Sequence, residues 1–261
     1  MTGVQTCALP ILFNLIVNKE QRVPDVQYFG TGEVRSADGK AVVLHSQEFH
    51  TSFWGHLGLL NLSSNLILPD YAGYPMTAAE SLFPDNTWIA SEARKQGGVV
   101  GYVHPFEQSE VNPVPAASLT NELPVSAALG LVDYYELIGF ADHRASEKVW
   151  HQLLNCGLRI PAGAGTDLMA DYASLRGPLG LNRVVARMEG VPDKESFLGK
   201  VKAGQSYVTN GPLIALDAKI ANANRTNFPS WIDFILMRID DLGLRGLTGT
   251  ALMIAAIYIA R

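Results

Sequence analysis

The chain has 261 residues, of which 48% are hydrophobic, and this is enough for one domain with a substantial buried core. Its net charge of −5 is spread without long runs, which argues against a nucleic-acid partner, because such a partner needs a basic stripe. Of the two cysteines, Cys7 lies in an atypical N-terminal segment and Cys156 at the end of an expected helix, so the sequence predicts no disulfide framework.

The N-terminal segment differs in character from the rest of the chain. Residues 1–11 match the translation of a common sequencing-library adapter, whereas the alternative, a short signal peptide, would need a basic start and a longer apolar stretch. We therefore expect residues 1–11 to be an adapter-derived artefact that contributes nothing coherent to the core. Residues 12–218 are expected to form the domain, with its first strand missing.

Polar residues that can bind metal follow apolar, strand-like runs at several places. The first place lies between the runs 41–44 and 57–62 and contains Glu48, His50 and His56. Carboxylate and imidazole are ligands that zinc, manganese and iron take at catalytic sites. The alternative interpretation is a polar loop whose histidines hydrogen-bond to the backbone.

Further along the chain, other apolar runs end in the same way. These are 99–103 before His104, 132–138 before His143, and 159–164 before Asp167. Barrel and doubly wound α/β enzymes carry their chemistry at the carboxyl edge of the sheet. We therefore expect Glu48, His104 and Asp167 to converge in one cleft at this edge, with His56 or His143 beside them.

Strand-like and helix-like stretches alternate along the chain, which predicts an α/β fold with a mainly parallel sheet. The expected strands are 12–17, 41–44, 57–62, 99–103, 132–138, 159–164, 183–187 and 206–209. The expected helices are 86–96, 122–129, 146–155 and 193–203. The stretch 105–121 is a long Pro/Ser-rich connection at the expected active edge, and its length is typical of a lid or a disordered segment.

The character of the chain changes again after Leu216. Residues 222–227 are a polar linker, and 231–261 are expected to be helical, with an uncharged second half that falls short of the ~20 residues that span a bilayer. We assign residues 219–261 as a linker and a C-terminal hydrophobic helix. Three interpretations of this helix stand: a clipped membrane helix, a packing helix or an assembly artefact. Contact with a membrane is expected only if the helix is genuine.

Three motifs carry a family resemblance: Gly97–Pro105 (GGVVGYVHP), Gly163–Asp167 (GAGTD) and Lys202–Pro212 (KAGQSYVTNGP). They resemble the polymerase-and-histidinol-phosphatase (PHP) superfamily, and more closely its carbaryl-hydrolase-like CehA/McbA branch, over about Leu12 to Leu216. The resemblance implies an α/β fold of the distorted (β/α)7 TIM-like kind, incomplete at the N-terminus, with metal ions at the carboxyl face of the strands.

The resemblance also implies roles for single residues. From it, the expected metal ligands are Glu48, His56, His104 and Asp167, and the expected catalytic residues are Glu48, His104 and Asp167. The residues themselves add His143 as a further expected metal ligand. They also add His50, Arg176 and Asn18 as expected substrate contacts, with a structural ion pair as the alternative for Arg176. The chain departs from the family pattern in three places. The opening His-x-His is absent, which fits a truncated start, Asn18 stands in the loop that usually supplies a histidine, and Met169 replaces the histidine of the closing motif. His143 or His50 is the candidate to compensate.

The expected function is a hydrolase that depends on one to three divalent ions of Zn, Mn or Fe. In it, a metal-bound hydroxide attacks an ester, carbamate or phosphoester bond of a small-molecule substrate. The sequence has no Gly-x-Ser-x-Gly elbow, which argues against a serine nucleophile. The alternative is a catalytically inactive, metal-depleted fragment or a ligand-binding module. Because the missing first strand would remove two ligands, we expect the truncated chain itself to be a weak or inactive hydrolase.

Overall fold

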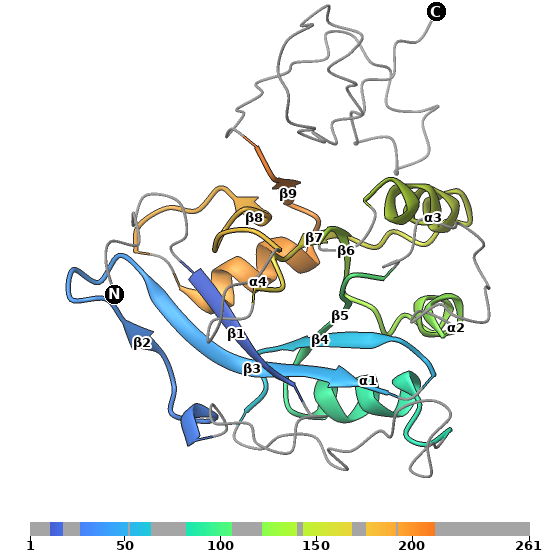
Figure 1. Ribbon diagram of the computed structural model, residues 1–261, viewed down its shortest axis with the longest axis horizontal. Coiled ribbons are helices and arrows are strands. Elements are labelled where there is room, and N and C mark those ends of the chain that lie inside the picture. The colour runs from blue at the N-terminus through green and yellow to red at the C-terminus, as the bar shows by residue number, and fades with distance from the viewer. Residues whose placement is uncertain are drawn as a thin grey trace, which may run out of the picture.

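The computed structural model describes residues 11–17, 27–51, 53–63, 82–105, 122–139, 143–168, 176–191 and 193–211. These residues form a mixed α/β fold around a curled, half-barrel sheet (Figure 1). The strands are β1 (Ile11–Val17), β2 (Val34–Arg35), β3 (Val42–His50), β4 (His56–Leu60), β5 (Val99–Tyr102), β6 (Tyr134–Ile138), β7 (Ala162–Ala164), β8 (Arg183–Ala186) and β9 (Ser206–Thr209). The helices are α1 (Asn86–Lys95), α2 (Leu123–Ala128), α3 (His143–Asn155) and α4 (Lys194–Lys202).

The sheet is mixed, so the prediction of a mainly parallel sheet holds only in part: β1, β3, β5, β6 and β7 run in one direction, and β2 and β4 run against them. Its strands follow the order β1-β3-β4-β5-β6-β7, with β2 paired to β3, while β8 and β9 form a separate antiparallel pair. The strand β4 runs antiparallel to both of its neighbours, β3 and β5. The cause is the short connection of residues 51–55 between β3 and β4, because a parallel crossover needs a dozen or more residues.

The positions of the other elements follow the sequence pattern closely. Each expected strand and helix is present within the described residues, although β3 continues through the polar residues to His50 and α3 begins at His143. The short strand β2 was not expected. The strand β1 begins at Ile11, one residue before the expected start of the domain.

Several sequence-based expectations lie outside the described residues, namely those on residues 1–10, Asn18, 106–121 and 219–261. Among the helices that the structure describes, none has the length and apolar character needed to cross a membrane.

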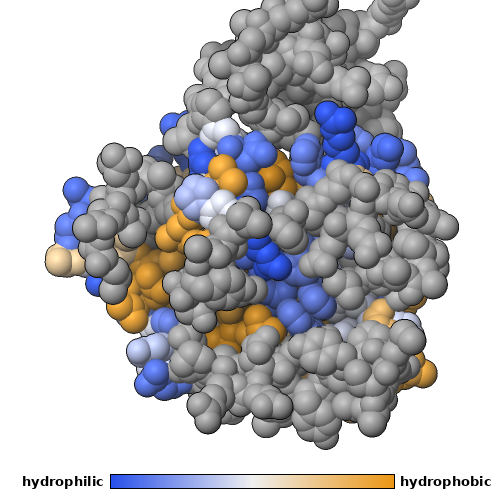
Figure 2. All heavy atoms as spheres, in the orientation of Figure 1, coloured by the Kyte–Doolittle hydropathy of each residue, from blue (hydrophilic) through white to orange (hydrophobic). Residues whose placement is uncertain are grey.

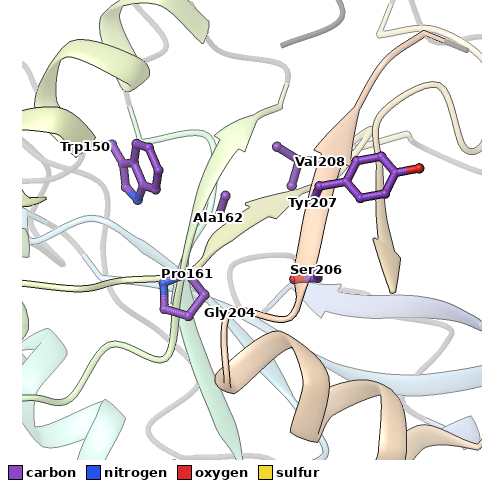
Figure 3. A pocket seen from close by; sticks show the side chains of 7 residues that line it. All are labelled: Trp150, Pro161, Ala162, Gly204, Ser206, Tyr207 and Val208. Carbon is purple, nitrogen blue, oxygen red and sulfur yellow. The ribbon is translucent and has the colours of Figure 1, made fainter. Parts of the chain in front are cut away.

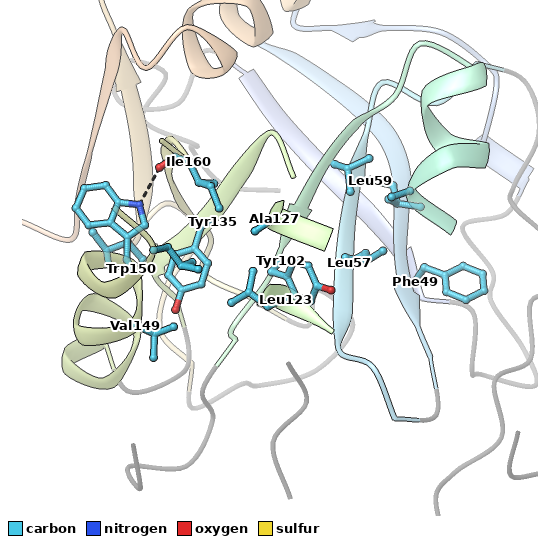
Figure 4. Packing of buried hydrophobic residues seen from close by; sticks show 14 of the residues in the cluster. Phe49, Leu57, Leu59, Tyr102, Leu123, Ala127, Tyr135, Val149, Trp150 and Ile160 are labelled. Atoms are coloured by element: carbon cyan, nitrogen blue, oxygen red, sulfur yellow. Dashed lines mark hydrogen bonds between the residues drawn. The ribbon is translucent and has the colours of Figure 1, made fainter. Parts of the chain in front are cut away.

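The larger hydrophobic core lies on the face of the sheet that α1, α2 and α3 cover (Figure 4). Side chains on successive strand residues point to opposite faces, and the alternate residues Phe49, Leu57 and Leu59 all belong to this core. From α3, Trp150 packs into the same cluster and donates a hydrogen bond from Nε1 to the Ile160 carbonyl at 2.8 Å. The polar tip of the indole is therefore satisfied inside the core.

The smaller core lies on the opposite face, which we call the α4 face because Leu198 and Val201 of α4 pack there. Tyr134 fills the middle of this face. A Cβ atom added to Gly58, Gly101 or Gly163 would lie 2.2–2.5 Å from an atom of the Tyr134 side chain, so these glycines on β4, β5 and β7 make room for one ring from β6. The Tyr134 hydroxyl donates to the Gly58 carbonyl at 3.0 Å.

The register of the strands decides which polar side chains share the α4 face. Glu48 lies opposite Gly58, which lies opposite Gly101, and Glu136 lies opposite Gly163. Because residues directly opposite each other point to the same face, Glu48 and Glu136 both project from the α4 face, beside the Tyr134 ring.

Two helices begin at aspartates that cap them. The Asp85 side chain accepts a hydrogen bond from Trp88 N at 2.7 Å at the start of α1, and Asp193 accepts from Ser196 N at 2.8 Å at the start of α4. Such caps satisfy backbone donors that have no partner within the helix. The first turn of α4 also carries Glu195.

Hydrophilic and hydrophobic side chains both reach the surface of the molecule. On the face drawn in Figure 2, hydrophilic residues gather near the centre with hydrophobic residues around them. The large hydrophobic side chains exposed among the described residues come from separate segments, for example Val34, Leu82, Val125 and Val191. Single exposed apolar residues of this kind are normal for a globular protein.

Candidate metal centre

Three of the expected ligands come together at one edge of the sheet. Glu48 lies near the carboxyl end of β3, His56 begins β4, and His104 follows β5. Because β4 runs antiparallel to β3 and β5, its amino end meets their carboxyl ends, and His50 pairs directly with His56 across the hairpin. The edge expected from the sequence is therefore the edge at which these side chains meet.

The three side chains surround one small space. Glu48 Oε1 lies 2.9 Å from His104 Nε2 and 3.6 Å from His56 Nδ1, and the two histidine nitrogens lie 3.4 Å apart. All three residues are buried. His50 joins them, since its Nε2 lies 2.9 Å from the same Glu48 oxygen and its ring stacks on His56 with centroids 3.6 Å apart.

The spacing of these donors suits a divalent ion. Two ligands about 2.1 Å from a tetrahedral ion lie roughly 3.4 Å from each other. The sides of the observed triangle, 2.9, 3.6 and 3.4 Å, are close to this spacing.

The electrostatics of the triangle keep its groups in their ligating forms. Burial by itself raises the pKa of Glu48, but hydrogen bonds from His104, His50 and His56 outweigh it and hold this pKa well below its usual range. Burial lowers the pKa of His56 to about 4, although Glu48 acts in the opposite direction. Near neutral pH, Glu48 is therefore a carboxylate and His56 a neutral imidazole, the forms that bind metal.

Two further carboxylates lie close to the triangle. Burial, and repulsion from Asp167 and Glu48, raise the pKa of Glu136 to about 8. The charge of His104 and the hydrogen bond from its backbone N–H act against this rise. Burial and the charge of Glu48 likewise raise the pKa of Asp167, opposed by His104 and Arg176. The three carboxylates thus lie near enough to repel one another, and a divalent cation among them would relieve that repulsion.

Two of the expected site residues have an unusual backbone. His104 has φ +29° and Asp167 has φ +54°, both in the left-handed region that favours glycine. A residue before proline usually adopts extended geometry, and His104 departs from it although Pro105 follows. The Glu136 carboxylate accepts a hydrogen bond from the His104 backbone N–H and holds the residue in this conformation. Backbone strain of this kind concentrates at functional sites.

The turn between β3 and β4 is held by Asn86, the fully buried first residue of α1. Its amide nitrogen donates to the carbonyl oxygens of Trp54 and Gly55 at 3.0 and 3.2 Å, and its amide oxygen accepts from Thr51 Oγ1 at 3.1 Å. The buried carboxylate of Glu122 accepts from Asn86 N at 2.6 Å and so fixes the start of the helix. The hairpin that carries His50 and His56 is therefore anchored from behind.

Asp167 is held from the other side of the site. Arg176 forms an ion pair with its carboxylate and donates to its backbone oxygen at 3.1 Å. The preceding loop is fixed by Asn182, whose amide donates to the Gly165 carbonyl at 3.0 Å. Arg176, expected to contact substrate, thus lies next to Asp167 with its side chain 24% exposed.

The structure does not gather every expected site residue, and it adds one that the sequence analysis missed. His143 is the first residue of α3, and within the described residues it is not part of the group formed by Glu48, His56 and His104. Asn18 lies outside the described residues. The missed residue is Glu136. A charged side chain within the otherwise apolar run 134–138 was the available signal.

Among the described residues, a cavity of about 20 Å³ lies away from the triangle, where β7 and β9 approach α3 (Figure 3). Trp150, Ala162 and Val208 contribute to its lining. Ligand pockets are more than ten times larger, at roughly 300–1,000 Å³, so this cavity has room for little more than a water molecule.

No protein-family model, curated protein or solved structure matches this chain. Function therefore has to be argued from the geometry and chemistry of the site.

Proposed function

We propose that this protein is a divalent-metal-dependent hydrolase that acts on ester, carbamate or phosphoester bonds of a small molecule. One observation carries the proposal: the donor triangle of Glu48, His56 and His104, whose sides of 2.9, 3.6 and 3.4 Å match the spacing of ligands around one ion. Two nitrogens and one carboxylate oxygen make a donor set of the kind found in catalytic zinc sites, which leave a coordination position open.

An ion held in the triangle would supply Lewis-acid chemistry, because it lowers the pKa of water and polarises a carbonyl or phosphoryl oxygen. The chain's own residues provide the rest of the site. Glu48, His56 and His104 hold the ion, and His50 orients the Glu48 carboxylate through its hydrogen bond at 2.9 Å. Asp167 has a raised pKa and lies beside the triangle, which suits it to accept or return a proton at its carboxylate.

The half-barrel also supports a proposal about the family. We propose that the chain is a PHP-like metallohydrolase of the CehA/McbA branch, whose sheet corresponds to part of a distorted (β/α)7 barrel. Two features support this: Glu48 and His104 lie at the carboxyl ends of β3 and β5, and the motif around His104 resembles the family pattern. In this reading Arg176 and His50 contact the substrate, and zinc, manganese or iron fills the site.

The experiment that tests the proposal combines metal analysis with turnover. The purified chain is analysed for zinc, manganese and iron by mass spectrometry and assayed on p-nitrophenyl phosphate and a naphthyl carbamate. The variants Glu48→Gln and His104→Ala are compared with His151→Ala, a histidine on α3 that lies next to Trp150 in the larger core. We expect the first two variants to lose metal and turnover and the third to keep both.

Different results would overturn different parts of the proposal. Metal bound by wild type and equally by His104→Ala would place the ion elsewhere. Metal bound in the triangle without turnover of either substrate class would favour the ligand-binding module over the hydrolase.

A further inference from the structure

Glu136 is a buried carboxylate for which the proposed chemistry has no direct use. It lies within β6, is 5% exposed, and projects from the α4 face at the edge where the triangle forms. Its Oε2 atom accepts a hydrogen bond from the backbone N–H of His104. Burying a carboxylate is costly, so its presence in an otherwise apolar strand calls for a compensating role.

Two glycines leave the space that this carboxylate occupies. A Cβ atom added at Gly139 would lie 2.6 Å from Glu136 Oε2, and one added at Gly165 would lie 2.3 Å from Oε1. Neither glycine has a positive φ, so no backbone requirement for glycine is evident at either position. Their lack of a side chain is what allows the carboxylate to reach His104.

The hydrogen bond from the His104 N–H to Glu136 stabilises a residue with a strained backbone. A non-glycine residue is strained in the left-handed region, and His104 adopts φ +29° there. The neighbouring Val103 N–H donates to the His56 carbonyl at 3.3 Å, so two successive backbone N–H groups are held where the chain enters the bend. With this geometry His104 Nε2 reaches Glu48 Oε1 at 2.9 Å.

We propose that Glu136 is a positioning residue: by accepting the His104 N–H, it holds the backbone in the conformation that aims the imidazole into the metal site. This inference rests on the proposed metal site. It requires Glu136 to act as a hydrogen-bond acceptor, and it does not require its negative charge. A glutamine at position 136 keeps an acceptor oxygen and therefore separates positioning from metal ligation.

The test is a titration of the full chain with Co²⁺, followed by the visible absorption of the ion, which reports its coordination geometry. We expect Glu136→Leu to weaken Co²⁺ binding at least about 10-fold and to change the spectrum, since loss of residues that orient ligands typically costs 10–100-fold. Gly139→Ala should do the same without altering any ionisable group, because its methyl displaces Oε2. Glu136→Gln should rescue most of the affinity and the wild-type spectrum.

Two matched controls separate positioning from general damage. Asp133 also accepts a backbone N–H from the β5 segment, that of Val100 at 2.9 Å, but at the opposite end of the strand. Gly199 in α4 has open space around its missing Cβ. Asp133→Asn and Gly199→Ala should therefore leave the Co²⁺ spectrum unchanged.

Each outcome decides the matter. If wild type binds no Co²⁺, the metal site and the positioning role both fall. If wild type binds Co²⁺ and Glu136→Leu and Gly139→Ala bind it with the wild-type affinity and spectrum, the positioning role is overturned while the metal site stands. If Glu136→Gln is as damaging as Glu136→Leu, the acceptor oxygen is not sufficient, and the positioning role as stated is overturned.

Discussion

Glu48 Oε1 is the atom that the imidazoles of His50 and His104 approach most closely, both at 2.9 Å. A carboxylate that is only 7% exposed would normally take up a proton, because burial disfavours its charge. Here the hydrogen bonds from the histidines hold the pKa of Glu48 low, so the negative charge persists in the interior. Neighbouring groups thus shift the pKa values of single residues of this centre, and shifted pKa values cluster at functional sites.

The raised pKa of Glu136 predicts how the stability of the metal-free protein depends on pH. In the folded chain this pKa is about 8, against an ordinary value of 4.5, so between these values the folded state binds the proton more tightly. The stabilisation is complete below pH 4.5 and is lost as the pH rises through 8. His56, whose pKa falls from 6.5 to about 4, has the opposite effect between pH 4 and 6.5. Between pH 6.5 and 8 the effect of His56 is complete, so the raised pKa of Glu136 makes stability fall with pH, and the raised pKa of Asp167 acts in the same direction.

Within this window the free energy of unfolding should fall by up to about 1.4 kcal/mol per pH unit. Chemical denaturation in the presence of EDTA at pH 6.5, 7.2 and 8 measures the slope. Glu136→Gln should flatten it, because an amide does not ionise. A slope that persists unchanged in this variant would show that another group is responsible.

At the scale of elements, the hairpin of β3 and β4 does most to form the centre, and its turn is anchored by α1. Asn86→Ala removes hydrogen bonds to Thr51, Trp54 and Gly55 and leaves buried groups without partners, which should cost roughly 2–4 kcal/mol of stability. Because His56 directly follows this turn, metal affinity should also fall by about 10-fold or more.

A neighbouring variant provides the comparison for Asn86→Ala. Asp85→Ala removes the cap of the same helix and should cost about 1 kcal/mol while leaving metal affinity unchanged. Denaturation and metal titration of both variants measure the two effects. If both variants reduce affinity in proportion to their loss of stability, the turn has no specific role in aligning His56.

The elements also show where the sequence was informative. Apolar runs such as Val99–Tyr102 predicted strands well, because strands buried on both faces consist of apolar residues. The end of β3 was missed because residues 45–50 alternate between Phe49, which faces the larger core, and the polar Glu48 and His50, which face the site. The polar residues Glu48 and His50 favoured a loop in the sequence, although they lie in the strand and belong to the candidate metal centre.

The ligands themselves were partly predictable for the same reason. Glu48 lies near the end of a strand, His104 follows one, and His56 begins the next strand after the short β3–β4 turn, so their placement at one edge could be inferred from the order of the elements. Glu136 and Asn86 could not be inferred in this way. Their roles depend on which backbone N–H or carbonyl lies opposite them, and this is set by register and by contacts between residues far apart in the sequence.

At the scale of the whole molecule, the centre lies where three neighbouring strands of the half-barrel, β3, β4 and β5, meet. Glu48 comes from β3, His56 from β4 and His104 from the end of β5, so an ion bound to all three ties neighbouring strands of the half-barrel together. The triangle does not exist in the unfolded chain, and ion binding therefore adds to the free energy of folding.

This linkage predicts that removal of metal lowers the thermal stability of the entire chain. At a free metal concentration of 100 times Kd, binding adds about 2.7 kcal/mol, which corresponds to a rise in Tm of roughly 5–10 °C for a protein of this size. Calorimetry of the EDTA-treated protein, with and without added Zn²⁺ or Mn²⁺, measures the difference. The rise in Tm should grow with the logarithm of metal concentration. It should disappear in His104→Ala, which lacks one of the three donor residues. A Tm that rises equally in wild type and in this variant would mean that the ion stabilises the fold from another site.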